Sequence, residues 1–156
     1  MIQRIQTVYL LLVTVLSGWT LFGTQAKLIS TETSLTYLLN FRGVVTATPD
    51  GGYFVSLQTW ALTALCLLFV ALSVATIFLY KKRLLQIRLC IVNGVLLVGY
   101  YALLFIYLWQ AGKVLAAEWY LQLPAAFPLV ALILIYLAIR AIAKDQALVK
   151  SLNRIR

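Results

Sequence analysis

The sequence predicts an all-α integral membrane protein, an antiparallel bundle of four transmembrane helices. Apolar stretches of about 20 residues, long enough to cross a hydrocarbon layer of roughly 30 Å, occupy approximately 5–23, 57–80, 89–109 and 123–142. The chain is 63% hydrophobic and 11% charged, and 156 residues are too few to bury so many apolar side chains in a water-soluble core. Since a membrane span must satisfy its own backbone hydrogen bonds, we expect each stretch to be helical.

The basic residues lie in alternate connecting segments. Segments 1–4, 81–88 and 140–156 contain ten Lys or Arg and one acid, whereas 24–56 and 110–122 contain three basic and three acidic residues. Lys and Arg beside a span are retained in the cytoplasm, so we expect both termini and the 81–88 loop to be cytoplasmic. The tryptophans independently fall near the opposite, outer surface, where indole rings are favoured. They are Trp19, Trp60, Trp109 and Trp119.

The first apolar stretch resembles a signal peptide in some respects. Arg4 precedes an apolar core at 8–16, and small residues follow at 24–26. The apolar run continues to Phe22, which is longer than a typical signal core. We therefore interpret it as a retained transmembrane helix.

The first outer loop, 24–56, contains a pattern that is not helical. Apolar and polar residues alternate over 35–45, and the turn sequence Pro49-Asp50-Gly51-Gly52 precedes an apolar segment at 53–55. Proline presets the first turn position and glycine tolerates positive φ, so the pattern favours a small β-hairpin. The alternative is a short interfacial helix through Leu35, Leu38 and Leu39.

The second and third stretches should be antiparallel neighbours, because the 81–88 connection is short. Small side chains let helix backbones approach in a membrane, and an amide there seeks a partner across the helix interface. For Asn93 the alternative is contact with a ligand or a partner helix. We also expect the hydroxyl of Tyr100 or Tyr101 to find an acceptor inside the bundle. The candidate helix-packing residues are Ala71, Ala75, Asn93, Gly94 and Gly99.

The fourth stretch should begin beside Pro124, where a missing N–H costs nothing, and Pro128 can tilt its outer end. From 138 to the end of the chain there is no Gly or Pro, and apolar residues recur at helical spacing. We therefore expect the helix to continue to about 155 as a cytoplasmic extension. This extension would dock on the bundle or lie against the membrane.

Residue types that catalysis requires are scarce. The chain has no histidine, no charged residue at the centre of a predicted span, and no glycine-rich phosphate loop. Cys66 and Cys90 should differ in depth by about 20 Å, too far for a disulfide, and they form no Cys-x-x-Cys motif. We expect no enzyme activity, no metal and no cofactor. The basic residues flank helix ends, which indicates phospholipid headgroups and not nucleic acid as their partner.

Three segments of the chain carry a family resemblance: MIQRIQTVYLLL, YKKRLLQIRLCIVN and AIRAIAKDQALVKSLNRIR. Together they resemble a family of small bacterial four-helix inner-membrane proteins, a domain of unknown function. Gln146 stands where that family carries an acid, and the family tends to have an Asp near Asn153, so this tail is the more basic. The resemblance implies a location in the bacterial cytoplasmic membrane. It implies no activity.

These observations favour a non-catalytic accessory or scaffold subunit that binds a larger membrane complex through its basic cytoplasmic face. The alternative is a lipid- or quinone-binding protein, or a weak transporter, with a cleft near Asn93 and Tyr100. Similarity to eukaryotic four-helix proteins with a strand-bearing first outer loop is an analogy that points to self-association. Asp145 should either pair with Arg88 or Arg140 or remain a solvated charge. The candidate surface residues are Arg4, Lys81, Lys82, Arg83, Arg88, Arg140, Lys144, Asp145, Lys150 and Arg154.

Overall fold

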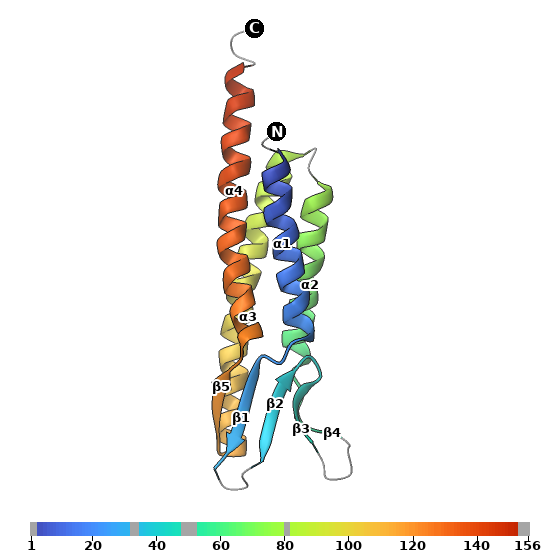
Figure 1. Ribbon diagram of the computed structural model, residues 1–156, viewed down its shortest axis with the longest axis vertical. Helices are drawn as coiled ribbons and strands as arrows, with labels where there is room; N and C mark the ends of the chain where they lie inside the picture. Colours follow the sequence, from blue (N-terminus) through green and yellow to red (C-terminus); the bar gives the residue numbers. More distant parts are fainter. Residues whose placement is uncertain (1–2, 32–34, 48–52, 80–81, 153–156) are drawn as a thin grey trace.

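The computed structural model describes residues 3–31, 35–47, 53–79 and 82–152, which form a helical bundle with a sheet at one end (Figure 1). The helices are α1 (Gln3–Phe22), α2 (Trp60–Phe78), α3 (Arg83–Leu115) and α4 (Phe127–Leu152), with the 3-10 helix η1 (Leu123–Ala126) before α4. The strands are β1 (Ala26–Ser30), β2 (Thr36–Asn40), β3 (Gly43–Ala47), β4 (Tyr53–Leu57) and β5 (Ala117–Leu121).

The four helices pack as a ring in which each contacts two neighbours. α1 lies between α4 and α2, and α3 lies between α2 and α4. The first described residues of α1 and the last of α4 are at the same end of the bundle, and the sheet is at the other (Figure 1). We call the end with these first and last described residues the basic end, because it carries Lys82 and Arg88. We call the opposite end the sheet end. At the basic end, α4 extends beyond the other helices (Figure 1).

Among the described residues, three helical segments are long and apolar enough to cross a membrane: Trp60–Phe78, Leu84–Leu115 and Leu123–Ala147. The helix α1 contributes a shorter apolar stretch, Thr7–Phe22. Large apolar side chains are exposed along the outside of all four helices, as a lipid-facing surface requires. The prediction of a mainly helical fold is therefore confirmed, and three of the helices have the length and apolar composition that a membrane span needs.

The third helix is longer than the sequence pattern indicated. It was expected over 89–109, and α3 runs over 33 residues, Arg83–Leu115, or about 50 Å. Its first two turns include Arg83 and Arg88, which the charge pattern assigned to a loop, because neither Gly nor Pro interrupts 83–88. Its last turns reach the sheet, where α3 packs beside β5.

Where the sequence predicted a small β-hairpin, the structure has an antiparallel sheet of five strands in the order β4-β3-β2-β1-β5. The segment expected to form one strand over 35–45 folds into two, β2 and β3, which reverse at Phe41 and Arg42. Gly43 follows this turn with φ 130°, a conformation that a side chain rarely adopts. β3 then pairs with β4 across 48–52, which lie outside the described residues. The alternative of an interfacial helix through Leu35, Leu38 and Leu39 is wrong, because Leu38 and Leu39 lie in β2.

The fifth strand comes from the segment between α3 and α4. The residue after α3, Ala116, has a left-handed backbone with φ 44°, which ends the helix and turns the chain back. β5 then pairs with β1 in antiparallel register from Ala26↔Leu121 to Ser30↔Ala117. Thr31 fixes the turn, because its backbone N–H and its hydroxyl both donate to the carbonyl of Ala116, at 3.1 and 2.7 Å.

One hydrophobic core runs through the bundle into the sheet. In β1 the buried residues alternate, so that Ala26 and Leu28 face the core, and Leu39 does the same in β2. These side chains join the cluster that includes Leu108 and Ala111 from the outer turns of α3. The sheet is therefore attached to the bundle by apolar packing as well as by the chain connections.

Candidate functional site

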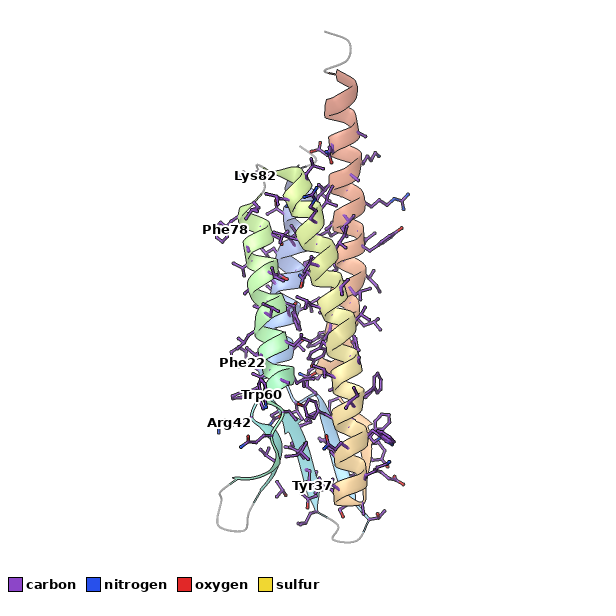
Figure 2. All side chains as sticks on the ribbon, turned by 180° about the vertical axis from the view of Figure 1, so that it is seen from behind. Phe22, Tyr37, Arg42, Trp60, Phe78 and Lys82 are labelled. Atoms are coloured by element: carbon purple, nitrogen blue, oxygen red, sulfur yellow. The ribbon has the colours of Figure 1, made fainter. Side chains whose placement is uncertain are left out.

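The described basic side chains at the basic end are exposed. Lys82 lies at the start of α3, Arg88 follows after about one and a half turns, and Arg140 and Lys144 lie one turn apart on α4 (Figure 2 labels Lys82). Lys81 and Arg154 fall outside the described residues. The side chains of Arg4, Arg83 and Lys150 are likewise outside the part of the chain that the structure describes.

Two polar side chains at the basic end are buried or half-buried in the bundle. Gln86, in the second turn of α3, is 4% exposed, and its amide donates to the carbonyl of Thr76 in α2 at 3.3 Å. Asp145 is half-buried on the face of α4 that it shares with Ala138 and Ile142, and its Oδ2 is enclosed by protein. Its pairing with Arg88 or Arg140 stays a prediction. The sequence did not single out Gln86 as a packing residue, because glutamine is common on exposed faces.

Inside the membrane-type region, Asn93 of α3 forms the polar contact to α2. Its amide donates to the hydroxyl of Ser73 at 2.7 Å, and that hydroxyl donates to the carbonyl of Phe69 at 2.9 Å. Asn93 is 2% exposed and Ser73 is fully buried. The contact therefore ties the two antiparallel helices that the short connection places side by side.

The small residues around Asn93 occupy different surroundings. Ala71 is exposed and Ala75 half-buried on α2. Gly94 and Gly99 are half-buried on α3, and a Cβ added to either would meet nothing within 4 Å. A close contact is instead found at Gly23, directly after α1, where an added Cβ would lie 2.6 Å from Cβ of the Pro124 ring. Spacing alone could not distinguish these glycines.

A small hollow lies where the bundle meets the sheet. It measures about 10 Å³, room for roughly one water molecule, and its lining includes Tyr100, Gln25 and Asn40. Gln25 is 3% exposed, and its amide donates to the carbonyls of Thr20 and Gly23. The oxygens Oε1 of Gln25 and Oδ1 of Asn40 are buried without a protein hydrogen bond. This hollow is too small for an organic substrate, and the Gln25 amide in its lining binds carbonyls at the end of α1.

The tyrosine and cysteine side chains are used in packing. The hydroxyl of Tyr101 donates to the carbonyl of Ala125 at 2.6 Å, which links α3 to η1. Tyr100 is 1% exposed and packs edge-on against Phe69 of α2. Cys66 and Cys90 are buried free thiols.

The described residues contain no group of three His, Cys, Asp or Glu side chains that could hold a metal ion. A search of curated proteins found no match to the chain. One family model matches residues 2–155, nearly the whole length, and its description is Domain of unknown function (DUF4293). Because this match covers nearly the whole length, the chain belongs to the DUF4293 family.

Proposed function

We propose that the protein spans the bacterial inner membrane four times, with both termini and the basic end in the cytoplasm. Its fourth span would be α1, whose apolar stretch Thr7–Phe22 lies in the ring beside the three longer helices. Exposed aromatic residues support this placement. Trp60 and Phe78 are 73% and 74% exposed at opposite ends of α2 (Figure 2), about 27 Å apart by helical rise, close to the thickness of a hydrocarbon layer.

Within that membrane, we propose a non-catalytic accessory or scaffold role, in which the basic cytoplasmic face binds a larger membrane complex. One observation supports this most directly. The helix α4 continues without a break to Leu152 and projects beyond the ends of the other helices (Figure 1). A rigid basic helix outside the bundle adds little to the bundle's own packing, so its use is best explained by contact with another molecule.

The test is co-purification of the tagged full-length chain from native membranes in mild detergent. We expect a membrane protein to be recovered in stoichiometric amount with the wild type. Reversing charge in the extension, with Lys150→Glu and Arg154→Glu together, should lower that recovery by about tenfold or more, because unlike charges that meet at an interface become like charges.

The matched control is Lys27→Glu with Lys113→Glu, which reverses the same number of charges at the sheet end. This variant should recover the partner as well as the wild type does. Recovery of no stoichiometric partner by the wild type, or equal recovery by both variants, would count against the accessory role. A dimer of the chain itself as the recovered species would indicate self-association instead.

The second candidate function is binding of a lipid or a quinone. It does not fit a cleft at Asn93 and Tyr100, since both side chains are buried inside the bundle. A separate groove on the outside of α3 and α4 favours it.

A further inference from the structure

An apolar groove lies on the bundle between α3 and α4. Its volume is about 380 Å³, within the range of small-molecule sites. It opens sideways, on the surface that would face lipid in the proposed membrane. The lining residues are Cys90, Ile91, Gly94, Val95, Val98, Leu132, Ile135, Tyr136 and Ile139.

The groove has a closed floor and open walls. Cys90 and Ile135 are 1% and 3% exposed and form its base, whereas Val95 and Tyr136 are 66% and 62% exposed at its sides. Gly94 contributes depth, because no atom lies within 4 Å of the place where a side chain would begin. A wall of methyl and methylene groups with one tyrosine suits a hydrocarbon chain.

The length and the position of the groove match one leaflet. From Cys90 to Val98 the helix rises about 12 Å, and half of a hydrocarbon layer is roughly 15 Å. The groove begins near the basic end, because α3 starts there and α4 leaves the membrane-type region there. An acyl chain lying in it would therefore belong to a lipid whose headgroup is at the basic end.

Exposed cationic side chains lie on α3 and α4 between the groove and the basic end. Arg88 precedes Ile91 by three residues on α3, and Arg140 follows Tyr136 by four on α4, so each shares a helix face with a groove residue. Lys144 extends the α4 face by one further turn. Asp145, the acid of this segment, lies on the side of α4 that carries Ala138 and Ile142, and neither of these two residues lines the groove.

We propose that this groove is a binding site for an anionic phospholipid of the cytoplasmic leaflet. One acyl chain lies between α3 and α4, and the phosphate is bound by Arg88 and Arg140. The guanidinium groups present paired N–H donors that match phosphate oxygens. The proposal rests on the membrane placement proposed above, but it does not depend on the accessory role.

Charge favours an anionic phospholipid over a quinone or a helix of a second copy as the occupant of the groove. A quinone is neutral and would leave the cations unused, and its carbonyls would find few donors on these walls. A helix from a second copy would bring Arg88 and Arg140 against another apolar or basic surface. An anionic headgroup would bring its phosphate to both arginines while the chain fills the groove, so it uses every feature of the site.

The experiment measures lipid retention by native mass spectrometry of the purified full-length chain in mild detergent. The probes are dioleoyl-phosphatidylglycerol and dioleoyl-phosphatidylcholine, added separately at equal concentrations. We expect one phosphatidylglycerol to be retained per chain, with about tenfold lower retention of phosphatidylcholine. Gly94→Leu places a side chain in the groove and should abolish retention of phosphatidylglycerol.

The control is Gly18→Leu, the same change on α1, where a Cβ also meets nothing within 4 Å. It should retain lipid as the wild type does. A second variant, Arg88→Gln with Arg140→Gln, keeps the groove but should remove the preference for phosphatidylglycerol. Full retention by Gly94→Leu, an unchanged preference in the arginine variant, or a dimer that Gly94→Leu dissociates would overturn the proposal. The orientation of the chain is measured separately by cysteine labelling, so failure of the topology is distinguishable from failure of the site.

Discussion

At the scale of single residues, the glycines of this chain serve opposite purposes. Gly23 is needed because a proline ring lies against it, with Cβ and Cγ of Pro124 2.6 and 2.7 Å from the position of an added Cβ. Gly18, five residues earlier on α1, has open space at the same place. The sequence places both glycines in the first apolar stretch, so the distinction arises only from where the segment between α3 and α4 returns to the bundle.

We predict that Gly23→Ala destabilises the protein by about 1–3 kcal/mol, because the methyl group must displace a rigid ring. Gly18→Ala should be neutral or stabilise by up to about 1 kcal/mol, since alanine is the better helix former. Circular dichroism during unfolding in a denaturing detergent measures both variants. Equal shifts in the two midpoints would show that Pro124 yields to the added methyl group.

At the scale of elements, α2 and α3 are joined by packing and by the Asn93–Ser73 hydrogen bond. Hydrogen bonds between helices in a membrane are worth on average about 0.6 kcal/mol and at most about 1.7 kcal/mol. The hydrogen bond therefore specifies how the two helices are aligned and contributes modestly to stability. The larger share comes from the apolar side chains around it.

We predict that Asn93→Ala and Ser73→Ala each destabilise the bundle, the asparagine variant by about 1–2 kcal/mol because it also leaves a cavity. The double variant should be less destabilised than the sum, by about 0.6 kcal/mol, since the hydrogen bond is lost only once. The same unfolding measurement gives all three values. Strict additivity would mean that the two side chains do not interact energetically.

At the scale of the whole molecule, the proposed orientation places the sheet outside the cytoplasm and the basic end within it. Introduced cysteines can test this, after Cys66 and Cys90 are replaced by alanine. We predict that a membrane-impermeant maleimide labels Asp50→Cys in intact spheroplasts and labels Arg156→Cys only after lysis. The reason is the retention of Lys and Arg on the cytoplasmic side during insertion.

Neutralising Lys81, Lys82 and Arg83 together should produce a mixed orientation, seen as partial labelling of Asp50→Cys. Neutralising Lys27, Arg42 and Lys113 at the sheet end is the matched control and should leave the labelling unchanged. If Asp50→Cys and Arg156→Cys are labelled from the same compartment, the four-span arrangement is excluded.

The sequence by itself determined the helical, membrane-type character of this protein, since apolar runs of spanning length have few other folds available to them. It also indicated a strand-forming outer loop and the family to which the chain belongs. These properties follow from local composition and from short motifs, and both can be read directly from a single sequence.

The tertiary structure decided which residues meet. The alternation over 35–45 could not reveal that the strand reverses at Phe41 and Arg42, or that β5 pairs with β1, because strand pairing joins residues far apart in the sequence. Nor could it show that Gly94 lies in an open groove and Gly23 against Pro124. A residue's spacing fixes its helix face, but the neighbouring helix, strand or loop determines what that face contacts.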